Sequence, residues 1–113
     1  MSLEVGGQWD AIQDNRFTAH FDIVQTGEQI DGGNRCSHSQ GTVKSVAAKG
    51  HVLNDYFEFL VTWDNATEGK YTGLIRRSGP DKGFITGDTE DTMHPGSHAG
   101  WRSSRNFPFP IWR

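Results

Sequence analysis

The sequence predicts an all-β fold, an antiparallel up-and-down β-barrel of about eight strands. Nearly every apolar segment alternates with a period of two residues, which is the period of a strand, rather than with the 3.6-residue period of a helix. The 14 glycines are spread along the chain and, with Asn and Asp, divide it into short segments at the spacing typical of sandwiches and barrels. A closed barrel is favoured over an open sheet because closure removes the exposed strand edges.

The expected strands follow one another with only short turns between them. They cover residues 7–12, 16–24, 29–34, 41–47, 52–63, 71–76, 83–86 and 99–107, and Asp55 marks the point at which the longest would break. In the second strand, Phe17, Ala19, Phe21 and Ile23 share one face, while the alternate positions are mostly polar. That alternation predicts one buried face and one wet face.

A hairpin around residues 64–69 is the strongest local signal. The large apolar side chains at every second position from Phe57 to Trp63 share one face of a strand. Turn-forming residues follow, and Tyr71 then opens the next apolar segment. The segment therefore predicts two neighbouring antiparallel strands.

Length, charge and cysteine content limit the class of protein. A chain of 113 residues forms one domain that can bury about two-thirds of its unfolded surface without disulfides. The net charge of −3 and the scattered Lys and Arg residues argue against nucleic acid or an anionic membrane as a partner. Cys36 has no second cysteine to pair with, and no apolar run approaches the roughly 18 residues of a membrane span.

The C-terminal segment, residues 107–113, is predicted to be distinct from the barrel domain of residues 1–106. Pro108 and Pro110 keep it out of a central strand, yet its other residues are mostly large and apolar. We therefore expect it to dock on the barrel or on a partner subunit.

Residues 87–95 place three carboxylates and a histidine in what the sequence predicts to be one loop, namely Asp88, Glu90, Asp91 and His94. Such a set could bind Ca²⁺ through oxygen or a transition metal through the imidazole. A solvated acidic turn is the favoured interpretation, because the spacing matches no established calcium loop. No nucleophile elbow, phosphate-binding loop or dinucleotide-binding glycine motif is present, so we expect no enzyme activity and no cofactor.

Aromatic and polar side chains suggest where a ligand would bind. Trp63 and Tyr71 are the expected walls, since indole and phenol rings stack on sugars and flat heterocycles. Trp101 lies among hydrogen-bonding side chains and is expected, with Asn15 and Asp88, to anchor polar groups of the ligand. A buried structural role for these tryptophans is the alternative.

The order of these motifs resembles that of the avidin and streptavidin family. Gly7-Gln8-Trp9 opens the pattern, the alternating strand ending in Trp63 and the segment Tyr71-Thr72-Gly73 follow, and Trp101 lies in the closing strand. The resemblance implies an eight-stranded barrel with a ligand site in its mouth and a homo-oligomeric assembly.

The residues that would contact biotin depart from that family. The resemblance implies an Asn and a Ser after the opening Trp, whereas this chain has residues 10–15, in which only Asn15 could replace them. Glu68-Gly69-Lys70 stands where the family has hydroxyl side chains. Unpaired polar groups of a buried urea cost roughly 1–3 kcal/mol each, so we expect no tight binding of biotin.

These observations predict a non-enzymatic binding module that holds a small polar-aromatic ligand or a glycan at the mouth of a barrel. Two alternatives stay open at this point. One is a metal-assisted hydrolase or isomerase that uses the residues from Asp88 to His94, and the other is a structural or assembly domain with a filled barrel.

Overall fold

The computed structural model describes residues 4–108, and every regular element in that range is a β-strand. The part described contains no helix of the length and hydropathy needed to cross a membrane. The strands are β1 (Gly7–Gln13), β2 (Thr18–Thr26), β3 (Gln29–Asp31), β4 (Ser37–His38), β5 (Val43–Leu53), β6 (Tyr56–Trp63), β7 (Glu68–Arg77), β8 (Lys82–Asp91), β9 (His98–Ser103) and β10 (Phe107–Pro108).

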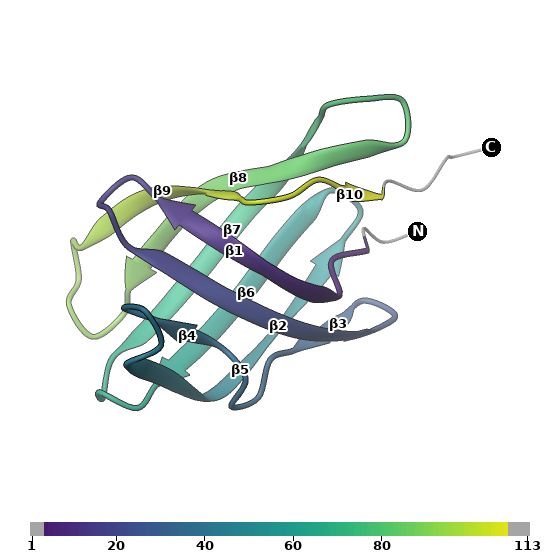
Figure 1. Cartoon of the computed structure of the whole chain (residues 1–113). Coiled ribbons are helices and arrows are strands. Elements are labelled where there is room, and N and C mark those ends of the chain that lie inside the picture. The colour runs from purple at the N-terminus through teal and green to yellow at the C-terminus, as the bar shows by residue number, and fades with distance from the viewer. Residues whose placement is uncertain (1–3, 109–113) are drawn as a thin grey trace.

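The strands form one closed antiparallel barrel with eight positions around it (Figure 1). From β5 to β9 each strand pairs with the next, and β1 closes the barrel by pairing with both β2 and β9. Two positions are each filled by two short strands: β3 and β4 both lie between β2 and β5, and β10 continues β9 along β8. The predicted all-β, up-and-down barrel is therefore confirmed.

The expected break near Asp55 is confirmed, because the turn between β5 and β6 falls at Asn54 and Asp55. The expected gap between residues 47 and 52 was wrong, because β5 continues through Gly50 to Leu53. Gly50 pairs with Phe59, and a Cβ at Gly50 would overlap the backbone of Glu58. This glycine permits a close approach of two strands rather than a turn.

Aromatic side chains fill the interior. Trp9, Phe21, Phe57, Phe59 and Trp101 are all buried, and their rings meet mostly edge to face. The centroids of Trp9 and Phe21, for example, lie 5.1 Å apart with their planes at 82°. Edge-to-face pairs of this kind contribute about 0.5–1.5 kcal/mol each beyond the burial of their area. The middle of the barrel is a packed core.

Phe17 departs from the predicted pattern. It was expected to share the buried face of Ala19, Phe21 and Ile23, but its side chain is 52% exposed. The residue precedes β2 in a turn, where Arg16 has a positive φ of 73° and the Phe17 amide donates to the side-chain oxygen of Asn15. The turn rotates the ring out of the strand alternation and toward the end of the barrel.

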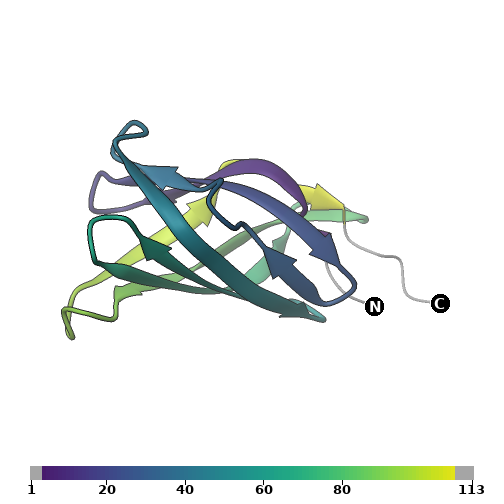
Figure 2. The ribbon, with the colours of Figure 1, turned by 90° about the horizontal axis from the view of Figure 1, so that it is seen from below.

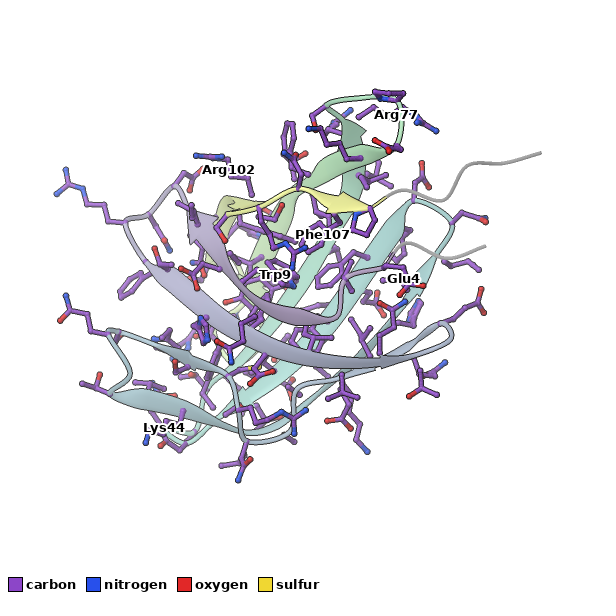
Figure 3. The ribbon with its side chains drawn as sticks, turned by 45° about the vertical axis from the view of Figure 1, so that its right-hand side comes forward. Glu4, Trp9, Lys44, Arg77, Arg102 and Phe107 are labelled. Atoms are coloured by element: carbon purple, nitrogen blue, oxygen red, sulfur yellow. The ribbon has the colours of Figure 1, made fainter. Side chains whose placement is uncertain are left out.

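One end of the barrel is closed by side chains from both ends of the described chain. Val5 is fully buried, and its carbonyl accepts a hydrogen bond from the indole N–H of Trp9 at 2.9 Å. Phe107, which is 1% exposed, packs against Trp9 with ring centroids 5.0 Å apart (Figure 3). Phe107 and Pro108, which form β10, therefore belong to the barrel, whereas residues 109–113 of the expected docking segment lie outside the described residues.

The opposite end carries the turns after β1 and β6, the connection of β4 to β5, and the β8–β9 loop (Figures 1 and 2). We call this end the mouth. It lies away from β10 and the start of β1, as both views show.

Candidate functional site

A pocket of about 240 Å³ opens at the mouth. The β1–β2 turn, β4, the β6–β7 turn and the β8–β9 loop surround it. It is lined by Gln13, Asn15, Phe17, His38, Trp63, Asn65, Thr67, Glu68, Gly69, Tyr71, Thr89, Glu90, Asp91, Ser97, His98 and Ala99. Pockets for drug-sized ligands measure about 300–1,000 Å³, so this one suits a small ligand or one ring of a larger ligand.

Three aromatic side chains form one wall. The imidazole of His38 stands edge-on to the indole of Trp63, with centroids 4.5 Å apart and planes at 88°. Phe17 also packs against His38, with ring centroids 6.3 Å apart and planes at 80°. Trp63 is inward-facing on β6 and only 5% exposed, whereas Phe17 is the open end of this wall.

A hydrogen-bonded chain of polar groups forms the floor. The Tyr71 hydroxyl donates to the amide oxygen of Gln13 at 3.0 Å, and the Gln13 amide nitrogen donates to Asn15 at 3.1 Å. Burial raises the pKa of Tyr71 far above its ordinary value, against a smaller lowering by its hydrogen bond with Thr89. The phenol therefore stays neutral and acts as a fixed hydrogen-bonding group.

Carboxylates surround the remaining side. Asp91 accepts a hydrogen bond from the Met93 amide at 3.0 Å and lies 2.8 Å from Nδ1 of His94. Burial, the largest single influence, raises the pKa of Asp91, but the hydrogen bonds from His94 and Met93 together lower it below its ordinary value. The Asp91 carboxylate is therefore ionised at neutral pH.

The other two acidic residues are held by neighbours. Glu68 accepts a hydrogen bond from the Thr92 hydroxyl at 2.7 Å, and Glu90 lies 3.1 Å from Nε2 of His98. Both stand at outward positions of their strands, so they border the pocket from its rim rather than from inside the barrel.

The structure brings three of the five predicted site residues together. Asn15, Trp63 and Tyr71 line the pocket. Asp88 does not; its carboxylate is on the exposed outer face, 3.0 Å from Nδ1 of His98. Trp101 is buried in the core, and its indole N–H donates to the carbonyls of Thr72 and Asp88.

The prediction of one loop over residues 87–95 was wrong. Residues 87–91 continue β8, so Asp88 and Glu90 point outward while Asp91 lies at the inner edge of the mouth. Gly87 suggested the start of a loop, but it pairs directly with Gly73 within the sheet. Among the residues that the structure describes, no three or more His, Cys, Asp or Glu side chains are placed to hold a metal ion.

Sequence reasoning missed Gln13, Phe17 and His38 as lining residues. Gln13 ends β1, and Phe17 was assigned to the core by its alternation. His38 lies on β4, a two-residue strand with no periodicity to recognise. The available signal was topological: in an up-and-down barrel all alternate turns meet at the same end, so polar residues near those turns gather around one mouth.

The pKa of His38 predicts a pH dependence of stability. Burial lowers this pKa below its ordinary value, and the Asp64 carboxylate only partly opposes the shift. The unfolded chain therefore binds the proton more readily, so this contribution to stability is complete above about pH 6.5 and is lost as the pH falls toward the folded-state pKa. We expect Tm to decline over that interval and to decline less steeply in His38→Gln. Thermal denaturation across a pH series measures both slopes, and equal slopes would contradict the assignment.

The fold defines a class, the closed eight-stranded antiparallel barrel, and it is compatible with an avidin-like barrel. Comparison with models of known protein families and with curated proteins found no match.

Proposed function

We propose that this protein is a non-enzymatic binding module that holds a small polar-aromatic ligand or a glycan at the mouth of its barrel. The observation that carries the proposal is the pocket itself, in which an aromatic wall faces a row of amides, hydroxyls and carboxylates. Aromatic faces that stack on a ring, together with planar polar side chains that fix its orientation, are the usual elements of such sites.

The state of the polar groups supports binding rather than catalysis. Tyr71 is neutral and is bonded to an amide, and the Asp91 carboxylate is engaged by His94 and by a backbone amide. A catalytic base or nucleophile instead needs a matched partner and a pKa near the working pH. The avidin resemblance adds a precedent for a ligand at this end of a barrel, and from it we also keep the prediction of a homo-oligomer.

The filled-barrel alternative draws support from the packed aromatic core, but the packing stops short of the mouth. A purely structural role would not require Phe17 to remain half exposed beside His38. The two interpretations therefore differ in what removal of that ring would do.

Phe17→Ala is the sharpest test. The ring contributes little to the core, so we expect Tm to change little while affinity for the ligand falls about threefold to tenfold, as for an aromatic residue at the edge of a binding site. Ligands come from a glycan array and a small-molecule screen that includes biotin, and the change is read from tryptophan fluorescence and calorimetry.

Leu53→Ala is the matched control, because it also removes an exposed apolar side chain but lies near the turn at the other end of the barrel. It should leave affinity unchanged. If the two variants bind a ligand from the screen equally well, that ligand binds outside the pocket. If the screen finds no ligand, the filled-barrel alternative is favoured.

A further inference from the structure

The charges around the pocket are of one sign. Glu68, Glu90 and Asp91 line it, and no Lys or Arg is among the lining residues in the described part of the chain. The nearby histidines do not reverse this sign, because His98 lies between the two carboxylates of Asp88 and Glu90, His94 lies beside Asp91 alone, and burial lowers the pKa of His38. The mouth therefore presents a negative field to an entering ligand.

Basic residues that neighbour the lining residues in the sequence lie outside the pocket. Arg16 stands between Asn15 and Phe17, and Lys70 stands between Gly69 and Tyr71, but neither lines the pocket. Lys70 is exposed at an outward position of β7, opposite Glu90 on β8. Lys44 is exposed on the outside of the barrel, and Arg77 lies on the β7–β8 hairpin toward the closed end (Figure 3). An anionic ligand would find no Lys or Arg among the lining residues, and transferring its charge out of water without such a partner costs free energy.

A second feature requires an acceptor on the same ligand. Trp63 is only 5% exposed, and its indole N–H has no hydrogen-bond acceptor among the described residues. No buried side-chain nitrogen or oxygen in the described range lacks a partner, so this N–H must retain contact with solvent. A Cβ at Gly69, which also lines the pocket, would lie only 3.3 Å from it, so the absent side chain leaves the N–H open to the pocket.

The remaining polar groups suit a hydroxylated ring. The amides of Gln13, Asn15 and Asn65 and the hydroxyls of Thr67 and Thr89 both donate and accept hydrogen bonds. We propose that the pocket takes a sugar ring that carries a free protonated amine, with the amine toward Asp91 and Glu90 and a ring or hydroxyl oxygen toward the Trp63 N–H. This inference rests on the proposed function and names the class of ligand.

Three sugars with the same ring test it: glucosamine, N-acetylglucosamine and glucuronic acid, each as the methyl glycoside. In a slightly acidic buffer they carry a positive charge, no charge and a negative charge, while Asp91 stays ionised. Binding is followed by NMR through the indole N–H resonance of Trp63, assigned with a Trp63→Phe variant. We expect glucosamine to bind at least about tenfold more tightly than the acetamide, and glucuronic acid more weakly than both.

Two charge-removing variants locate the effect. Asp91→Asn and Glu90→Gln should each reduce the preference for the amine over the acetamide, and Asp91→Asn should reduce it more, because Asp91 lies at the inner edge of the mouth and Glu90 at its rim. Asp55→Asn makes the same change in the turn at the closed end and should leave the preference intact. The ratio of two affinities is measured within each variant, so a modest loss of stability does not obscure it.

The outcomes separate this inference from the proposal on which it rests. If the acetamide or the acidic sugar binds as well as the amine, the charge preference is overturned but the binding module is not. The same holds if none of the three sugars shifts the Trp63 resonance but another screened ligand does. A Trp63 resonance that responds to no sugar and to no other screened ligand would overturn both.

Discussion

Truncation of the chain after Asn106 should lower the free energy of unfolding by roughly 3–5 kcal/mol, the usual cost of deleting a buried phenylalanine. The deletion removes Phe107, which packs on Trp9 and under the guanidinium of Arg105, together with the pairing of β10 with β8. For a domain of this size the change corresponds to a fall in Tm on the order of 10 °C or more, measured by thermal denaturation.

A second truncation, after Pro108, is the control. It keeps Phe107 and β10 and removes only residues 109–113, which the structure does not describe. An intermediate Tm would assign further stability to those residues. If they reach a partner subunit, sedimentation of the second variant should also shift toward the monomer. A Tm of the first variant equal to that of the full chain would show that Phe107 does not support the barrel.

Gly87→Ala should be the most damaging change of a single small side chain. Gly87 faces Gly73 across β7 and β8, and a Cβ at Gly87 would overlap the carbonyl of Thr72. The two strands must separate to admit the methyl group, which would weaken their hydrogen bonds. Overpacking typically costs 1–3 kcal/mol, and we expect about 3 kcal/mol here because the obstacle is backbone rather than a flexible side chain.

Gly100→Ala is the matched control on the neighbouring strand. Its added methyl would meet the end of the Asp14 side chain, which can rotate away. We expect this change to cost less than about 1 kcal/mol. Chemical denaturation of both variants measures the difference, and a loss in Gly100→Ala as large as in Gly87→Ala would mean that close strand approach is not the cause.

The barrel could be predicted because its signal is repeated in every segment. Period-two alternation in β2, β6 and β7 and the turn residues between them point to one architecture, and strand closure follows from the need to cover edges. Some predicted strand boundaries were wrong because glycine can mark either a turn or a close approach of two strands. Gly50 and Gly87 read as turn residues in the sequence but allow close strand approach in the fold.

The site was predictable only in part, for a related reason. Trp63 and Tyr71 stand at inward positions near strand ends, which alternation and a turn signal can locate. Trp101 has the same local pattern but lies deeper in the barrel, and depth depends on the stagger of strands rather than on any local sequence. His38 lines the pocket because the chain leaves β3 and pairs with β2 again as β4, and this interruption of the strand has no periodic sequence pattern.

The closed end of the barrel has a consequence for how the protein can be attached to something else. The chain enters β1 and leaves β10 at that end, beside Val5 and Phe107, while the pocket opens at the other (Figures 1 and 2). The longest extent of the molecule is 45 Å. A surface, a tether or a neighbouring module attached before Val5 or after Pro108 would therefore join the barrel at its closed end, and the pocket would open on the side away from the attachment.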